Sequence, residues 1–237
     1  MFKDREEAGS RLAGALETLD LRDPIVYALP RGGVPVAAAA ADRLKAPLDL
    51  IMVRKLGAPG RPEAAIGAVV DNAAPTVILH DETVQHLNIS RDYIDNLTAT
   101  ALHEIDRRRE IYLKGRKPLS PKNRTAIVVD DGLATGATME AAVKALRKAE
   151  PRKIVVAVPT APGDAVRALC NIADDVICLE TPAPFWSVGS QYDDFRQLSD
   201  EDVIRCLARH AAAANMTGSD SAQGGETRMS QGTGEAI

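Results

Sequence analysis

The chain has 237 residues, 45% hydrophobic and 26% charged, which is typical of a globular protein long enough for one large domain or two small ones. Its 29 Lys and Arg residues against 33 Asp and Glu residues give a net charge of −4. No overall positive field is therefore present to hold a nucleic acid, and aromatic residues, at 3%, are too few for stacking platforms. We expect no general nucleic-acid binding.

The cysteines and the apolar segments indicate the cellular compartment in which we expect the protein. Cys170, Cys178 and Cys206 show no CxxC spacing and form no even set for a disulfide framework, which fits a reducing cytoplasm. The first twenty residues are charged and amphipathic, unlike a signal peptide. No uncharged apolar stretch approaches the roughly 18 to 20 residues needed to cross a bilayer. We therefore expect a cytoplasmic protein with no membrane partner.

Short apolar runs alternate with helical patterns up to about residue 210, which predicts βαβ units and a mainly parallel sheet. Most of the runs are continuously apolar, which indicates burial on both faces. The predicted strands are 25–28, 48–53, 66–70, 76–79, 125–129, 154–158 and 176–179. The predicted helices are about 5–19, 34–46, 90–114, 138–149, 162–170 and 199–213. Pro35 suits a first helical turn, and Ser199 with Asp202 resembles a capping box.

Two segments interrupt this alternation. The long polar helix 90–114 has one apolar stripe, and we interpret the surrounding residues, about 80–120, as a helical insertion. From about residue 211 the chain is rich in Gly, Ser, Thr and Gln without periodicity, which predicts a disordered tail over 211–237. Residues 1–210 would then form a single domain.

The segment from Ala126 to Glu140, AIVVDDGLATGATME, is the most informative part of the chain. It combines an apolar strand, two carboxylates, a loop of small and hydroxylated residues, and a helix start near Thr138. Such a loop lets the backbone curl with its N–H groups pointing inward at a helix N-terminus, which makes an anion site. Asp130 and Asp131 follow the strand, where open α/β sheets bind ligands. The alternative is an ordinary strand-to-helix turn in which both acids are turn or capping groups.

This segment resembles the signature with which type I phosphoribosyltransferases bind phosphoribosyl diphosphate (PRPP). By that resemblance, Asp130 and Asp131 would bind the 2- and 3-hydroxyls of the ribose. The residues that would wrap the 5-phosphate are Ala134, Thr135, Gly136, Ala137 and Thr138. Gly132 replaces the branched aliphatic residue that is usual in the family. Ala134 stands where the 6-oxopurine enzymes carry an Asp, so this position resembles the adenine enzymes.

A second segment, 25–36, is also predicted as a strand, a glycine-containing turn and a helix start. Alone, its LPRGG turn is typical of many tight turns. Beside the first segment it is similar to the pyrophosphate loop of the family, and to the SRGG loop of the xanthine-type enzymes. The resemblance implies a diphosphate loop whose backbone amides are exposed by an unusual peptide geometry. Its residues are Leu29, Pro30, Arg31, Gly32 and Gly33.

A third segment, 52–67, begins with a basic pair, Arg54 and Lys55. Its turn-forming residues are Gly57, Pro59, Gly60 and Pro62. This composition predicts a mobile loop with positive charge at its base. The orotate enzymes have a similar RK pair, and by that resemblance a loop over 54–65 would close on the leaving diphosphate. The alternative is a solvated basic pair at a strand end.

The resemblance covers about residues 24–180 and implies a phosphoribosyltransferase-like α/β fold: doubly wound, with a mainly parallel sheet flanked by helices, a helical insertion and a small C-terminal hood. The implied activity transfers the phosphoribosyl group of PRPP to a nitrogen of a base-like acceptor in nucleotide metabolism and releases pyrophosphate. Magnesium would be required and bound through PRPP, with no metal ligand assigned in the protein. We expect a homodimer. The catalytic residues would be Arg31, Arg54, Lys55, Asp130 and Asp131.

The acceptor stays open, because the three segments resemble adenine, xanthine and orotate enzymes respectively. A PRPP-sensing regulator that performs no transfer, or an RNA-interacting protein, is the alternative function. The basic cluster over 107–117 would serve the latter, although its acidic neighbours favour a solvated helix face. Phe185, Trp186 and Tyr192 follow the last strand. There a flat acceptor could stack on Phe185 or Trp186, or the segment could form a lid or a dimer contact.

Overall fold

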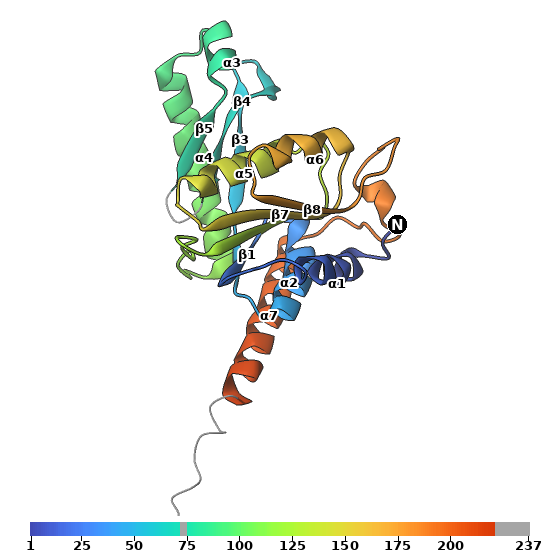
Figure 1. Cartoon of the computed structure of the whole chain (residues 1–237). Coiled ribbons are helices and arrows are strands. Elements are labelled where there is room, and N and C mark those ends of the chain that lie inside the picture. Colours follow the sequence, from blue (N-terminus) through green and yellow to red (C-terminus); the bar gives the residue numbers. More distant parts are fainter. Residues whose placement is uncertain (72–74, 221–237) are drawn as a thin grey trace, which may run out of the picture.

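The fold is that of a computed structural model (Figure 1), which describes residues 1–71 and 75–220, with the backbone alone for 62–63 and 214–220. Its centre is a five-stranded sheet in which every pairing is parallel, with the order β2-β1-β6-β7-β8. The strands are β1 (Pro24–Ala28), β2 (Leu48–Leu50), β6 (Thr125–Val129), β7 (Lys153–Thr160) and β8 (Asp175–Glu180). The predicted α/β fold with a mainly parallel sheet is confirmed.

Helices cover both faces of this sheet, as the continuously apolar strands predicted. On one face, Val26 and Ile127 pack with α1 (Arg5–Leu16), α2 (Gly33–Leu44) and the beginning of α7 (Asp200–Asp220). On the other face, their chain neighbours Ile25 and Val128 pack with α5 (Ala137–Arg147) and α6 (Gly163–Cys170). The alternation along each strand thus places one apolar side chain in each layer.

A second sheet, which was not predicted, stands beside the first. Its strands, β3 (Met52–Ala58), β4 (Arg61–Asp71) and β5 (Thr76–Leu79), pair antiparallel in that order. The predicted strand 48–53 is therefore divided, because the chain leaves the main sheet after Leu50 and enters β3 at Met52. The sheet and the insertion helices α3 (Asp81–His86) and α4 (Arg91–Leu113) project from the main body (Figure 1). Helix α3 was not predicted.

Residues 54–65, which were predicted as a mobile loop, form the β3–β4 hairpin. Pro59 and Gly60 are the two residues between the strands, and Gly60 has a φ of 69°, as the second central residue of a type II turn requires. The register shifts on both sides of Gly57, which is how a strand absorbs a bulge. The turn-forming residues thus mark a tight turn and a bulge.

Helix α7 passes the boundary at which the tail was predicted to begin. The capping box is confirmed, since the Asp202 amide donates to Ser199 Oγ at 3.2 Å and the Ser199 amide donates to Asp202 Oδ2 at 3.0 Å. The helix continues to Asp220, and Figure 1 shows its end extending away from the body. The rest of the predicted tail, 221–237, lies outside the described residues. Within 1–71 and 75–220, no helix is long and apolar enough to span a bilayer.

Candidate functional site

The two loops predicted to form one site lie against each other at the carboxyl ends of neighbouring strands. The Leu29 amide donates to the carbonyl of Val129 at 2.9 Å, which extends the β1–β6 pairing into the loops. A Cβ placed on Gly32 would lie 2.1 Å from Asp131 Oδ2, and one on Gly33 would lie 2.7 Å from the carbonyl of Val129. Because Gly32 and Gly33 lack a Cβ, the loop over 29–33, here called the Arg31 loop, can approach the two carboxylates.

The loop after Asp131 presents free backbone donors at the N-terminus of α5. Leu133 donates its amide to Thr160 O at 3.0 Å, which anchors the loop to β7. Gly136 has a φ of 77° and caps α5 without a side chain. In the described part of the chain, the amides of Ala134, Thr135, Gly136 and Thr138 find no acceptor. Exposed, unpaired amides at a helix N-terminus suit a phosphate group.

Gly132 is required at its position by its surroundings. Its φ is 156°, and an added Cβ would lie 2.6 Å from Val188 Cγ1 and 3.0 Å from Thr160 Cγ2. The branched aliphatic residue that is usual at this place would collide with both. The segment after β8, which carries Val188, therefore packs directly on the loop that follows Asp131.

The two carboxylates occupy different environments. The Asp131 amide donates to Asp130 Oδ1 at 2.9 Å. Burial and the neighbouring Asp131 charge raise the pKa of Asp130 well above its ordinary range. Burial also raises the pKa of Asp131, while the adjacent Arg5 guanidinium opposes that rise. A pair of buried acids of this kind is stabilised by donors or cations that a ligand brings.

Arg5 and Tyr192 belong to this site and were not predicted for it. Arg5 Nε donates to Asp131 Oδ2 at 2.8 Å, and Arg5 Nη1 donates to the Arg196 carbonyl at 3.1 Å. The guanidinium also lies 3.9 Å from the centre of the Phe195 ring. Tyr192 donates its hydroxyl to the Asp131 carbonyl at 2.6 Å. The start of the chain and the segment after β8 thus fix Asp131 from two sides, and Asp131 is not a free carboxylate.

The Arg31 loop has the unusual geometry that its resemblance implied, since the Pro30–Arg31 peptide bond is cis. The loop leads directly into α2, with the Gly33 amide donating to Leu29 O at 3.1 Å. The Arg31 side chain is 39% exposed and lies 3.6 Å, from Nη1 to Oδ1, from Asp200 at the start of α7. The structure therefore brings Arg31, Gly32, Gly33, Asp130 and Asp131 together.

Arg54 and Lys55 are separated by the hairpin that carries them. Consecutive strand residues point to opposite faces. Lys55 lines a hollow between the second sheet and α5, together with Ala137 and Thr138. Met52 and Leu56, which flank Arg54 at two-residue spacing, lie in the core cluster that includes residues of α4. Lys55 thus faces the N-terminus of α5, whereas Arg54 lies on the other face of the hairpin, so the two side chains do not share one position.

Comparisons with known proteins decide the family. The family model described as the phosphoribosyl transferase domain matches residues 5–194. The chain belongs to the phosphoribosyl transferase domain family. Proteins of two Mycobacterium tuberculosis strains, each provisionally named a phosphoribosyl transferase, are 42% identical over 209 residues, which are 88% of this chain and 47% of each relative. The chain thus spans about half the length of these curated relatives. The crystal structure of TT1426 from Thermus thermophilus has a TM-score of 0.78 and 41% identity, covering 88% of this chain and 98% of that one.

A magnesium ion needs only a few ligands from the protein itself. Mg²⁺ is commonly held by one or two carboxylates plus substrate phosphates and water. In the described part of this chain, no group of three or more His, Cys, Asp and Glu side chains is arranged to hold a metal ion. The Asp130 and Asp131 carboxylates beside the unpaired loop amides fit an ion that arrives with a phosphorylated substrate.

The basic cluster of the insertion is largely engaged by acids of this domain. Arg107 and Arg108 both donate to Glu104, with their Nε atoms 2.9 and 2.8 Å from its oxygens. Arg109 was expected on a solvated face, but its side chain is only 12% exposed and donates to Asp71 at 2.8 Å. Arg109 therefore ties α4 to β4, and the cluster is not a uniform surface for a polyanion.

The three aromatic residues after β8 have different positions. Tyr192 is buried, with its ring centre 5.4 Å from that of Phe2 and 5.0 Å from that of Phe195. Phe185 is half-buried, and Trp186 is 81% exposed. Tyr192 has a structural role, because its hydroxyl holds the Asp131 carbonyl. Only Phe185 and Trp186 retain a surface for an acceptor, a lid or another subunit.

Proposed function

We propose that this domain transfers the phosphoribosyl group of PRPP to a nitrogen of a base-like acceptor and releases pyrophosphate, with magnesium bound through PRPP. The contact between the Arg31 loop and the two carboxylates is the observation that supports this most strongly. PRPP carries three groups close to one another that a binding site must recognise: a diphosphate, a ribose diol and a 5-phosphate. The Arg31 loop, the acids at 130 and 131, and the loop over 134–138 offer a partner for each.

In the proposed reaction, the diphosphate leaves as the ribose gains oxocarbenium character. The protein lowers the barrier by stabilising charge on the leaving group and by fixing the sugar. Arg31 and Lys55 act on the diphosphate, and Arg54 contributes only as a more distant charge, because it lies on the other face of the hairpin. Bound magnesium would supply further positive charge at the diphosphate.

The sugar is held by the remaining groups. Asp130 accepts from a ribose hydroxyl, and Asp131 does so with the oxygen that Arg5 leaves available. The amides of Ala134, Thr135, Gly136 and Thr138, together with Ala137, surround the 5-phosphate at the N-terminus of α5. Phe185 and Trp186 lie on the segment that packs against this loop, and we assign the acceptor to their side of the site.

Binding of magnesium PRPP is the first test. A ligand present at about 100 times its Kd stabilises the native state by about 2.7 kcal/mol, which raises the Tm of a protein of this size by about 5–10 °C. Ribose 5-phosphate and pyrophosphate, each with magnesium, serve as partial ligands. No shift with PRPP at millimolar concentration would contradict both the transferase and the PRPP-sensing alternative.

Pyrophosphate release separates those two functions. We expect one acceptor from a panel of purines, pyrimidines and pyridines to release pyrophosphate from PRPP in proportion to enzyme. PRPP binding without release for any acceptor would favour the sensing regulator. Sedimentation of the chain tests the proposed homodimer, and labelled RNA added to the same samples tests the RNA-interacting alternative.

A further inference from the structure

Arg31 lies where three distant parts of the chain meet. Its Nη1 is 3.6 Å from Asp200 Oδ1, and Tyr112 donates its hydroxyl to the same oxygen at 2.6 Å. Arg31 belongs to the loop after β1, Tyr112 to the last turn of the insertion helix α4, and Asp200 to the first turn of α7. The insertion and the C-terminal helix therefore both reach the proposed diphosphate loop.

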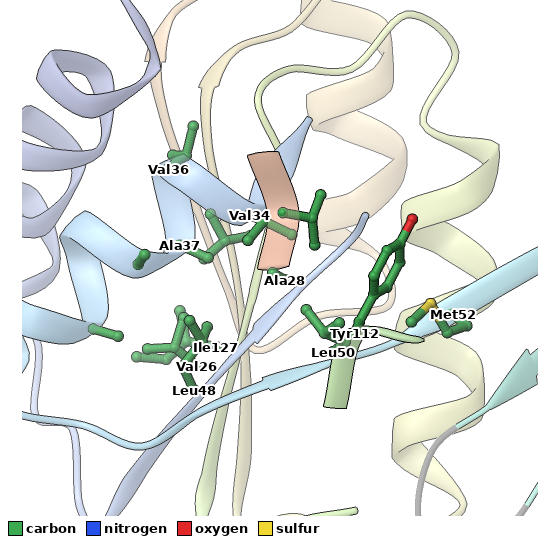
Figure 2. Packing of buried hydrophobic residues seen from close by; sticks show 14 of the residues in the cluster. Val26, Ala28, Val34, Val36, Ala37, Leu48, Leu50, Met52, Tyr112 and Ile127 are labelled. Atoms are coloured by element: carbon green, nitrogen blue, oxygen red, sulfur yellow. The ribbon is translucent and has the colours of Figure 1, made fainter. Parts of the chain in front are cut away.

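Tyr112 is a rigid support for Asp200. Its side chain belongs to the main core cluster and the residue is only 4% exposed. Figure 2 shows its ring beside Leu50 and Met52, with the hydroxyl directed away from them. Burial and the Asp200 carboxylate raise the pKa of Tyr112 to about 12, so it remains a donor at neutral pH. The capping box of Ser199 and Asp202 fixes the backbone on either side of Asp200.

Arg31, by contrast, keeps its donors available. In the described part of the chain, the structure records no hydrogen bond from the Arg31 guanidinium, and the Asp200 contact is longer than the roughly 2.7–2.9 Å of a charge-assisted hydrogen bond. The carboxylate thus attracts the guanidinium without occupying its forked donor edge. A planar guanidinium with that edge free can bind two oxygens of a diphosphate at once.

We propose that Asp200 is a positioning residue for Arg31, and that Tyr112 fixes Asp200 for this purpose. The inference rests on the proposed function, because it takes diphosphate as the ligand of the Arg31 loop. Asp200 limits the directions that the Arg31 side chain samples, so less conformational freedom is lost when the diphosphate binds. It also gives the insertion helix a part in substrate binding, through Tyr112.

Calorimetric titration with magnesium pyrophosphate and with magnesium PRPP tests the inference. We expect Asp200→Asn to raise both dissociation constants by about 10-fold and Tyr112→Phe by about 3-fold. Glu201→Gln, at the neighbouring exposed position in α7, is the matched control and should leave both constants unchanged. If Asp200 had only a structural role, Asp200→Asn would lower the Tm without this specific loss of diphosphate affinity. Tyr112→Phe retains the ring, so it tests the inference even if Asp200→Asn folds poorly.

A double-mutant cycle identifies Arg31 as the residue through which Asp200 acts. In an Arg31→Ala background, Asp200→Asn should cause no further loss of affinity, because the group it positions is gone. An equal loss in both backgrounds, or unchanged affinity of Asp200→Asn in the native background, overturns the inference and leaves the proposed function intact. If the native chain binds neither ligand, both the proposed function and this inference are overturned.

Discussion

Arg5 Nε donates to Asp131 Oδ2 at 2.8 Å and thereby joins the first helix of the chain to the acid that follows the central strand, 126 residues away. Both side chains are largely buried, at 9% and 13% exposed. Phe195 covers the guanidinium, and Tyr192 holds the backbone of Asp131. Asp131, at the centre of the proposed site, thus connects α1 with the segment that follows β8.

Loss of Arg5 is expected to destabilise the fold strongly. Arg5→Ala leaves a buried carboxylate without its cation, which costs about 3–5 kcal/mol of unfolding free energy. Urea unfolding monitored by circular dichroism measures this. The control is Arg209→Ala, because Arg209 pairs with Glu6 at the same 2.8 Å distance but with side chains 64% and 63% exposed. That exposed pair should contribute no more than about 1 kcal/mol, and equal losses for the two variants would contradict a buried, structurally important Arg5.

Neutralising Asp130 is expected to stabilise the ligand-free protein while removing PRPP binding. Its pKa is raised in the folded state, so the native fold favours the protonated form, and stability is lost as the pH rises through that raised pKa. Asp130→Asn has no charge to lose, so its Tm should exceed that of the native chain at pH 7. Each kcal/mol gained corresponds to about 2–4 °C.

The pH dependence distinguishes this effect from a general one. The difference in Tm between Asp130→Asn and the native chain should shrink as the pH falls from the raised pKa toward the ordinary Asp pKa of about 3.9. Below that pH it should vanish, because Asp130 is then uncharged in both the folded and the unfolded chain. Asp20→Asn, at an exposed position, serves as the control and should show no such trend. An Asp130→Asn variant that is less stable at pH 7, or that still gains stability from magnesium PRPP, would contradict the assignment.

Glycine at position 33 is expected to be essential for both stability and binding. An added Cβ would lie 2.7 Å from the Val129 carbonyl and 2.8 Å from Asp130 Cα, so Gly33→Ala must move backbone apart. We expect a loss of about 1–3 kcal/mol and no thermal shift with PRPP. Gly163→Ala is the control, because its Cβ would meet only the end of the Arg167 side chain, at 3.4 Å. A Gly33→Ala variant with native PRPP affinity would mean that the two loops need not touch.

The sequence predicts the strand and the loop at the centre of the proposed site because its signals there are local. The strand, the acids and the small-residue loop over 126–140 are contiguous, so propensity and chemistry can be recognised together. Arg5 and Tyr192 reach Asp131 across 126 and 61 residues, and neither lies in a pattern that marks a site. Residues 54–65 of the β3–β4 hairpin were predicted as a loop because Pro59 and Gly60 predict a turn without giving the pairing on either side.

The separation of Arg54 and Lys55 leads to the last prediction. A resemblance treats the RK pair as one feature, but strand pairing turns Lys55 toward Ala137 and Thr138 and Arg54 toward the opposite face. Lys55→Ala should therefore raise the dissociation constant of magnesium pyrophosphate by about 10-fold, because it removes a cation beside the phosphate loop. Arg54→Ala, the matched control on the same strand, should change it by no more than about 2-fold, as expected for a more distant, screened charge. Equal losses would mean that the hairpin rearranges on binding so that both side chains reach the ligand.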